Sequence, residues 1–163
     1  MYKVIDNFLS DKEFAKLQNI LMGNGMPWYY NPNITTDVVD HKHLYMSHKF
    51  YGNNQFSDMF QFVKPLINKI EPDSLIRVKA NLYPNQGEIY KHDYHYDYEF
   101  SHQAAVFGIN DNDGGTIMLD GEVVKSASNR IVFFDGSDMH SSTTCTDASA
   151  RININVNYMK EDA

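Results

Sequence analysis

The second half of the chain alternates apolar and polar residues with a period of two, and this pattern restricts the fold more than any other feature. The run "LIRVKANLY" at residues 75–83 sets four apolar side chains against Arg77, Lys79, Asn81 and Tyr83. Further short runs follow, separated by turn-forming segments such as "NDNDGG": "AAVFGIN", "GTIMLDG", "RIVFFDG" and "RININVNYM". Such alternation is typical of strands with one buried face. We therefore expect an antiparallel sheet or barrel in this half.

The first half of the chain carries two helical signals. Ser10 and Glu13 have the spacing of a capping box, and apolar residues then recur at helical intervals, which predicts a helix over residues 11–22. The segment "NQFSDMFQFVKPLINKI" at residues 54–70 carries an apolar stripe and predicts a second helix, which Pro65 is expected to kink. Helices followed by strands indicate a mostly β fold with flanking α-helices.

The length and charge of the chain limit the classes of protein to which it can belong. Its 163 residues, without repeat or linker, fit one domain over residues 1–163, with helical support over about 1–74 and a strand-rich core over about 75–160. The net charge of −7 without a Lys/Arg run disfavours a nucleic-acid partner. Cys145 is the single cysteine and no long apolar stretch is present, so we expect a cytoplasmic protein without membrane contact.

Residues that bind metals gather immediately before one of the apolar runs, in "KHDYHYDYEF" at residues 91–100. His95 and Asp97 are two positions apart, so on a strand their side chains point the same way, about 6.5–7 Å apart, and can reach one ion. His140 follows a later apolar strand and a turn, and supplies a third candidate ligand. The alternative for the H-x-D pair is a solvated strand end, because this triplet occurs often by chance.

The three candidate ligands and a later arginine indicate a particular kind of metal site. Two histidines and one carboxylate leave three positions open on an octahedral metal, which is typical of non-haem Fe(II) oxygenases. Arg151 lies eleven residues after His140 and opens a strand whose polar face is otherwise asparagine. An arginine holds a carboxylate at two points, so Arg151 is placed to bind the far carboxylate of an anionic co-substrate. The alternative interpretation of Arg151 is a strand residue that pairs with an acidic side chain at the surface.

The order H-x-D, distal histidine and arginine resembles the 2-oxoglutarate- and Fe(II)-dependent oxygenases, and within them the small prolyl-4-hydroxylase-like group with its stand-alone, phage-encoded members. The resemblance covers residues 77–159 and includes "NDNDGGTIML" and "NRIVFFDGSDMHSS". It implies a double-stranded β-helix, a jelly roll of two facing sheets with the iron near its open end. It also implies three metal-binding, catalytic residues, His95, Asp97 and His140. Two further residues, Arg151 and Tyr83, would bind the co-substrate, with Tyr90 as the alternative to Tyr83.

The chemistry implied by the resemblance is oxidation of a substrate with Fe(II), 2-oxoglutarate and O2, with ascorbate as a further candidate cofactor. The enzyme would be a dioxygenase that hydroxylates a peptidyl residue such as proline, in the host cytoplasm if the chain is phage-encoded. The aromatic segments 28–51 and 94–102 are expected at the pocket mouth. A small metabolite or a nucleobase is the alternative substrate, and a cupin-like metal enzyme or a non-catalytic jelly-roll binding protein is the alternative class. The oligomeric state is not predicted.

The remaining histidines and the lone tryptophan are expected to have supporting roles. On a continuous strand His92 would face away from the candidate ligands, so we expect it at the rim or in support of a ligand. His41, His43 and His48 are expected as polar residues near the pocket mouth rather than as a second metal site. Trp28 is expected in the core.

Overall fold

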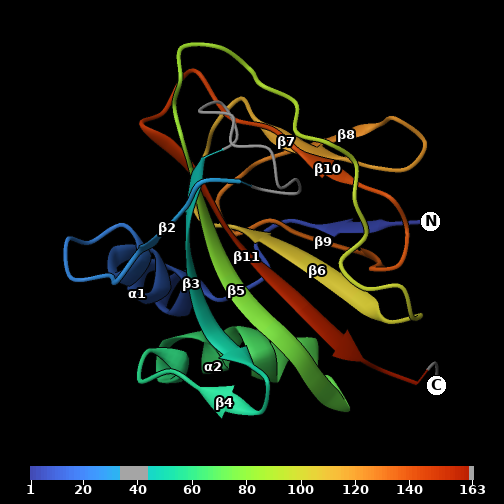
Figure 1. Cartoon of the computed structure of the whole chain (residues 1–163). Helices are drawn as coiled ribbons and strands as arrows, with labels where there is room; N and C mark the ends of the chain where they lie inside the picture. The colour runs from blue at the N-terminus through green and yellow to red at the C-terminus, as the bar shows by residue number, and fades with distance from the viewer. Residues whose placement is uncertain (34–43, 162–163) are drawn as a thin grey trace.

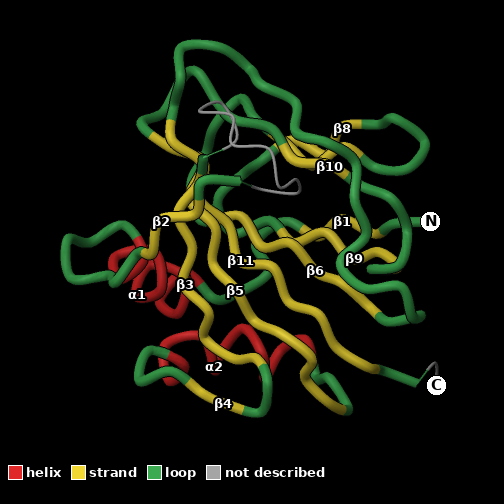
Figure 2. Tube along the Cα trace, in the orientation of Figure 1, coloured by secondary structure: helices red, strands yellow, loops and turns green. Residues whose placement is uncertain are grey.

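The computed structural model describes residues 1–33 and 44–161, which form two helices and two antiparallel β-sheets (Figures 1 and 2). The helices are α1 (Asp11–Leu21) and α2 (Phe60–Ile70). The strands are β1 (Lys3–Ile5), β2 (Tyr29–Asn31), β3 (Tyr45–Gly52), β4 (Gln55–Phe56), β5 (Ser74–Pro84), β6 (Gln103–Gly108), β7 (Gly115–Ile117), β8 (Val123–Lys125), β9 (Ile131–Asp135), β10 (Ser141–Ser142) and β11 (Ala150–Met159). Neither helix is long and apolar enough to cross a membrane.

The larger sheet is built around the pairing of β5 with β11. Its strand order is β1-β9-β6-β11-β5-β3-β2, and β4 pairs with β3. In the β5–β11 register, Arg151 lies opposite Tyr83 and Asn157 lies opposite Arg77. Residues paired across a sheet project their side chains from the same face. The polar sides of the two strands therefore form one continuous polar surface, as their alternation predicts.

The opposite face of this sheet is apolar and is covered by the two helices (Figure 1). Val78, Ala80, Ile154 and Val156 have no exposed surface on this side. The buried helix residues that join the same core are Leu17, Leu21, Val63, Leu66, Ile67 and Ile70. The helical stripes and the strand alternation thus form the two sides of one core, because each element buries the face that its period makes apolar.

Helix α1 begins where the capping box predicts. The side-chain oxygen of Ser10 accepts a hydrogen bond from the backbone N–H of Glu13, and the Glu13 carboxylate accepts one from the backbone N–H of Ser10. These bonds satisfy donors that the first turn of a helix otherwise leaves without a partner. The helix ends at Leu21, one residue before its expected end.

Helix α2 is shorter than predicted, because it begins at Phe60 rather than at residue 54. Asn53 and Asn54 both have positive φ, at 53° and 58°, and form the two-residue turn that joins β3 to β4. Two positive φ angles are what a tight hairpin requires, and asparagine tolerates them. Phe56 therefore belongs to a hairpin and is 62% exposed, although it extends the apolar stripe of the helix. Pro65 lies inside α2, and the kink expected at this residue stays a prediction.

The smaller sheet, in the order β10-β7-β8, lies beside the polar face of the larger one (Figure 1). A cavity between the two is lined by residues of β5 and β11 from the larger sheet and of β7 and β10 from the smaller. Two sheets that enclose a pocket, with helices on the outer face, confirm the predicted mostly β, jelly-roll fold.

His48 does not lie near the cavity, so this part of the prediction is wrong. It is buried on β3 opposite Ala80, which places it on the face that the helices cover. Its Nδ1 atom lies 2.9 Å from the carbonyl oxygen of Pro27, and its Nε2 atom lies 3.0 Å from the hydroxyl of Ser57. Both ring nitrogens are therefore engaged in contacts that stabilise the fold.

Trp28 is partly buried and packs against the main core, as expected. His41 and His43 lie outside the described residues. The organisation of the whole chain as one domain stays a prediction.

The core assignment predicts a large loss of stability for Leu66→Ala. Leu66 has no exposed surface and belongs to the core between α2 and the sheet, so removal of its side chain should lower the free energy of unfolding by about 2–5 kcal/mol. Urea denaturation followed by circular dichroism measures this change. Leu119→Ala makes the same change at a side chain that is 62% exposed, and should cost about 0.5 kcal/mol or less. Equal losses in the two variants would contradict the core assignment.

Candidate metal centre

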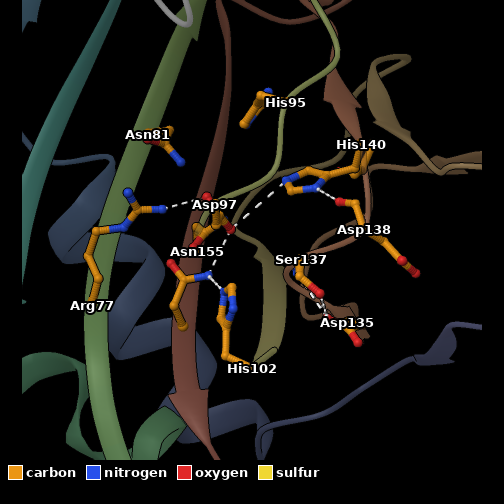
Figure 3. A network of polar contacts seen from close by, with 12 residues as sticks. Arg77, Asn81, His95, Asp97, His102, Asp135, Ser137, Asp138, His140 and Asn155 are labelled. Carbon is orange, nitrogen blue, oxygen red and sulfur yellow. Dashed lines mark hydrogen bonds and ion pairs between the residues drawn. The ribbon is translucent and has the colours of Figure 1, made fainter. Parts of the chain in front are cut away.

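The three residues predicted as metal ligands come together in the cavity between the sheets (Figure 3). One ligand atom each from His95, Asp97 and His140 lies within 4.8 Å of the other two. Within residues 1–33 and 44–161, this is the one group of three or more histidine, cysteine or acidic side chains arranged in this way. The H-x-D…H triad is therefore present as a spatial cluster as well as a sequence pattern.

His95 and Asp97 lie in the loop between β5 and β6, so the expectation of a continuous strand through the H-x-D triplet is wrong. The loop forms backbone hydrogen bonds with residues 136–144 at separate positions and not as a continuous strand pairing. The backbone N–H groups of His95 and His140 donate to each other's carbonyl oxygens at 2.9 Å, and the N–H of Asp97 donates to Gly136 at 3.1 Å. These bonds hold the two imidazole rings 4.7 Å apart between centroids, so the ligands converge without a strand.

Backbone carbonyl groups orient both imidazole rings. The Nδ1 atom of His95 lies 3.3 Å from the carbonyl oxygen of Asp93, and Nδ1 of His140 lies 2.9 Å from that of Asp138. A carbonyl oxygen only accepts, so each Nδ1 carries the proton and each Nε2 keeps a lone pair for a metal. Burial lowers the pKa of His95, and the neighbouring His140 adds to this effect. The neutral form, which is the form that binds metals, is therefore favoured for His95.

The carboxylate of Asp97 is buried and surrounded by donors from the two central strands (Figure 3). Its Oδ1 atom accepts a charge-assisted bond of 2.6 Å from Arg77, and its Oδ2 atom accepts bonds of 3.1 Å and 2.7 Å from the amides of Asn155 and Asn157. Burial alone raises the pKa of Asp97, but Arg77, His140 and the two amides outweigh it and hold this pKa below its usual range. Asp97 is therefore ionised at neutral pH.

This donor set fits a divalent transition metal. It offers two imidazole nitrogens with oriented lone pairs and one fixed, ionised carboxylate, the combination that suits Fe(II) and leaves coordination positions for other molecules. The assignment of the three residues as ligands is a proposal, which substitutions of Asp97 and His140 test.

Arg151 is the most deeply buried cation at this cavity, with 2% of its surface exposed. Its guanidinium donates to the hydroxyls of Ser126 and Thr116, at 2.7 Å and 3.0 Å, and to the carbonyl oxygen of Thr143 at 3.2 Å. No carboxylate among the described residues pairs with it. The alternative of a strand arginine paired with a surface acid is therefore wrong. A buried charge without a counter-charge is costly, which favours an anionic ligand at this position.

Tyr83 lies beside this guanidinium, with its ring centroid 5.5 Å from the central carbon of Arg151 and 5.8 Å from the stacked ring of Tyr45. Burial raises the pKa of Tyr83, so it keeps its hydroxyl proton. His92 packs against Tyr83 at 5.3 Å between centroids and places Nδ1 2.8 Å from the hydroxyl of Ser142. His92 is buried, so it supports the site from inside and is not a rim residue.

Sequence reasoning missed several residues that line the cavity or hold its candidate ligands. Arg77, Asn155 and Asn157 are read from the sequence only as polar positions on strands, yet they hold the carboxylate of the triad. Lys79 and Tyr45 also line the cavity. For those on β5 and β11, the sequence offers one clue to their role: each lies on the same strand face as Tyr83 or Arg151. The cavity that these side chains enclose has a volume of about 50 Å³.

No protein-family model and no curated protein matches the sequence. Solved structures do match. A prolyl hydroxylase from Trichoplax adhaerens, solved with a peptide fragment of the oxygen degradation domain of hypoxia inducible factor, aligns with a TM-score of 0.67 at 13% identity, over 97% of this chain and 83% of its own. A Pseudomonas putida prolyl-4-hydroxylase aligns with a TM-score of 0.60 at 15% identity, over 98% and 92%.

A third match is an oxidoreductase of the 2OG-Fe(II) oxygenase family from Burkholderia pseudomallei, with a TM-score of 0.71 at 10% identity, over 99% of this chain and 86% of its own. The chain therefore has the fold of the 2-oxoglutarate- and Fe(II)-dependent oxygenases, and prolyl hydroxylases are among its structural neighbours. At these identities the likeness concerns the fold alone, so activity rests on the site.

The metal assignment predicts that Asp97→Ala and His140→Ala each abolish binding of one Fe(II) ion, because two ligands hold the ion far less tightly than three. Anaerobic calorimetry with Fe(II) measures the binding, and thermal unfolding checks that the variants fold. Asp93→Ala is the matched control, since it removes an exposed carboxylate from the same loop and should leave the affinity unchanged. Wild-type affinity in both Asp97→Ala and His140→Ala would show that the ligands are other residues.

Proposed function

We propose that the chain is a non-haem Fe(II)- and 2-oxoglutarate-dependent dioxygenase. The observation that carries this proposal is the buried guanidinium of Arg151, which has no carboxylate partner among the described residues and lines the same cavity as the triad. A metal site alone also suits a cupin-like enzyme that uses no 2-oxoglutarate. A metal site beside a buried cation that lacks a counter-charge suits a co-substrate that chelates the metal at one end and carries a carboxylate at the other.

The three ligands have distinct tasks in this proposal. The Nε2 atoms of His95 and His140 and the carboxylate of Asp97 would hold the Fe(II) ion. Arg77 and the two asparagine amides keep that carboxylate ionised and fixed in place, which preserves its orientation when the co-substrate enters.

The far end of the cavity would bind the co-substrate. Arg151 would form the ion pair with the far carboxylate of 2-oxoglutarate, and Tyr83 would donate a hydrogen bond from its protonated hydroxyl. Ser126 and Thr116 fix the plane of the guanidinium, so its remaining donors are oriented before the ligand arrives. This preorganisation reduces the entropy lost on binding.

Fe(II), 2-oxoglutarate and O2 together supply the oxidation: one oxygen atom of O2 converts a substrate C–H bond to C–OH, and the other enters succinate as 2-oxoglutarate loses CO2. The protein itself would bind and orient the reactants and exclude water from the cavity. Its two sheets enclose the reacting positions on the sides where Arg151, Tyr83 and His140 are buried.

A peptidyl residue, with proline first, is the substrate that we favour. Tyr94, Tyr96 and Phe100 are 45%, 44% and 52% exposed on the loop that carries the H-x-D triplet, and Tyr29 and Tyr30 are exposed on edge strand β2. Tyrosines combine an apolar ring with a hydrogen-bonding tip, which suits an extended peptide. The Trichoplax adhaerens neighbour is itself solved with a peptide fragment. A small metabolite or a nucleobase is the alternative substrate.

The co-substrate assignment predicts that Arg151→Gln weakens 2-oxoglutarate binding about ten- to a hundredfold, because one charge-assisted hydrogen bond contributes roughly 1.5–3 kcal/mol. The weak visible band of an iron-bound 2-oxo acid, titrated without oxygen, measures the affinity. Arg151→Lys should recover part of the loss, since it keeps the charge without the planar fork. Arg130→Gln, which removes a surface arginine paired with Asp6, is the control and should bind as the wild type does. Loss of Fe(II) binding together with 2-oxoglutarate binding in Arg151→Gln would instead assign Arg151 to the fold.

The substrate assignment predicts that proline-containing peptides stimulate conversion of 2-oxoglutarate to succinate, with a gain of one oxygen in the peptide by mass spectrometry. The Asp97→Ala variant is the control and should show neither product. Stimulation by a nucleotide or a free amino acid, with every peptide at background, would overturn the peptidyl substrate and keep the oxygenase assignment.

A further inference from the structure

The cavity that contains the triad holds more positive charge than the proposed reaction uses. Arg77, Lys79 and Arg151 line it, against the single carboxylate of Asp97. The two histidines of the triad are neutral when they bind a metal. The charges of a divalent ion and of 2-oxoglutarate cancel, so the loaded cavity keeps an excess of two positive charges. The chain as a whole carries a net charge of −7, so its composition does not explain this gathering of cations.

Lys79 is the cation without an assigned task. Arg77 pairs with Asp97 at 2.6 Å, and Arg151 is the proposed partner of the co-substrate. The ammonium group of Lys79 lies 5.3 Å from the centroid of the Tyr45 ring and 3.5 Å from its hydroxyl. No carboxylate of residues 1–33 or 44–161 forms an ion pair with it. Among the described residues, Lys79 therefore lines the cavity without an ion-pair partner, and Asp97 is the carboxylate that acts on its charge from a distance.

The immediate neighbours of Lys79 on the sheet include two further cations. Lys49 of β3 lies directly opposite Lys79 in the register of the sheet, so both side chains leave the same face. Arg77 lies two residues away on that face of β5. Burial, Arg77 and Lys49 lower the pKa of Lys79 to about 8, against the opposing effect of Asp97, so the amine is mainly protonated at neutral pH. Like charges directly opposite one another destabilise a sheet, whereas the Tyr45 ring and the charge of Asp97 favour the ammonium group.

An anionic group in the cavity would offset this repulsion. The metal ligands and the proposed co-substrate residues are complete without Lys79, so the remaining reactant, the substrate, is the molecule that can supply the anion. Lys79 is half-buried, while Arg151 is 2% exposed, which places the lysine nearer to the solvent from which a substrate enters.

We infer that Lys79 binds a carboxylate of the substrate, so that the oxidised group lies beside an acidic one. The inference rests on the proposed function, because it takes the cavity as the place where substrate meets metal. The carboxylate belongs either to an acidic side chain of a peptide or to a small carboxylic acid, and both present the same group to the same ammonium. Lys79 thus selects acidic substrates over neutral and basic ones.

The experiment compares four probes with protein loaded with Fe(II) and 2-oxoglutarate in the absence of O2. Three are pentapeptides capped at both ends, Gly-Glu-Pro-Glu-Gly, Gly-Gln-Pro-Gln-Gly and Gly-Lys-Pro-Lys-Gly, and the fourth is free glutamate. Calorimetry gives the affinities, and succinate formation after admission of air gives KM. The proteins are the wild type, Lys79→Met, Lys79→Glu and the control Lys16→Met, which removes an exposed lysine of α1. Methionine retains an unbranched apolar stem against Tyr45, so Lys79→Met removes the charge with little loss of packing.

The wild type and Lys16→Met should bind the Glu peptide about tenfold or more tightly than the Gln peptide, the change expected for one charge-assisted hydrogen bond. Lys79→Met should bind the two alike, with a raised KM for the Glu peptide, and Lys79→Glu should prefer the Lys peptide. Binding of free glutamate that depends on Lys79, with no peptide bound, would identify the small acid as the source of the carboxylate.

Two results overturn the inference: no preference of the wild type for either acidic probe, or a preference that persists in Lys79→Met. Failure of the proposed function gives a different result. In that case acidic probes still bind in a manner that depends on Lys79, while the wild type shows neither the 2-oxo acid band nor succinate formation.

Discussion

The pairing of β5 with β11 is the constraint on which the candidate site depends. Its register sets Tyr83 opposite Arg151 and Arg77 opposite Asn157, so the polar sides of both strands face the cavity and their apolar sides face the helices. A slip of one residue would turn all of these polar side chains into the core. The helices therefore stabilise the site indirectly, because the apolar surface that they bury disfavours such a slip.

The same pairing stabilises a charge that burial disfavours. The side chain of Asp97 is 5% exposed, and the donors that keep it ionised come from Arg77 on β5 and from two asparagines on β11. A residue of a loop is thus held by side chains of the two central strands. Burial of a charged network contributes little to stability in itself. Its presence is explained by the proposed task, which is to keep a metal ligand deprotonated and oriented.

Two further cations of the cavity, Arg151 and Lys79, have no carboxylate partner among the described residues. Burial lowers the pKa of both side chains, and such local conflicts between burial and charge are expected where a protein binds something. Arg151 is more deeply buried than Lys79, and this difference places the two proposed ligands at different depths of the cavity. The proposed co-substrate would lie with Arg151 in the interior, and the proposed acidic group of the substrate would lie with Lys79 nearer to solvent. The exposed aromatic residues of the H-x-D loop would then contact the rest of the substrate.

By itself the sequence determined the local features: the strand alternation, the capping box, and the order of H-x-D, distal histidine and Arg151 that indicates the metal centre. Only the tertiary structure decided where α2 begins, because Asn53 and Asn54 form a turn that needs β3 and β4 as partners. It also decided that the H-x-D triplet lies in a loop and which residues surround Asp97 and Lys79. The physical reason is that the period of apolar residues along the chain determines which face of its element a side chain occupies. Which residue lies opposite that side chain depends on the register between segments far apart in sequence.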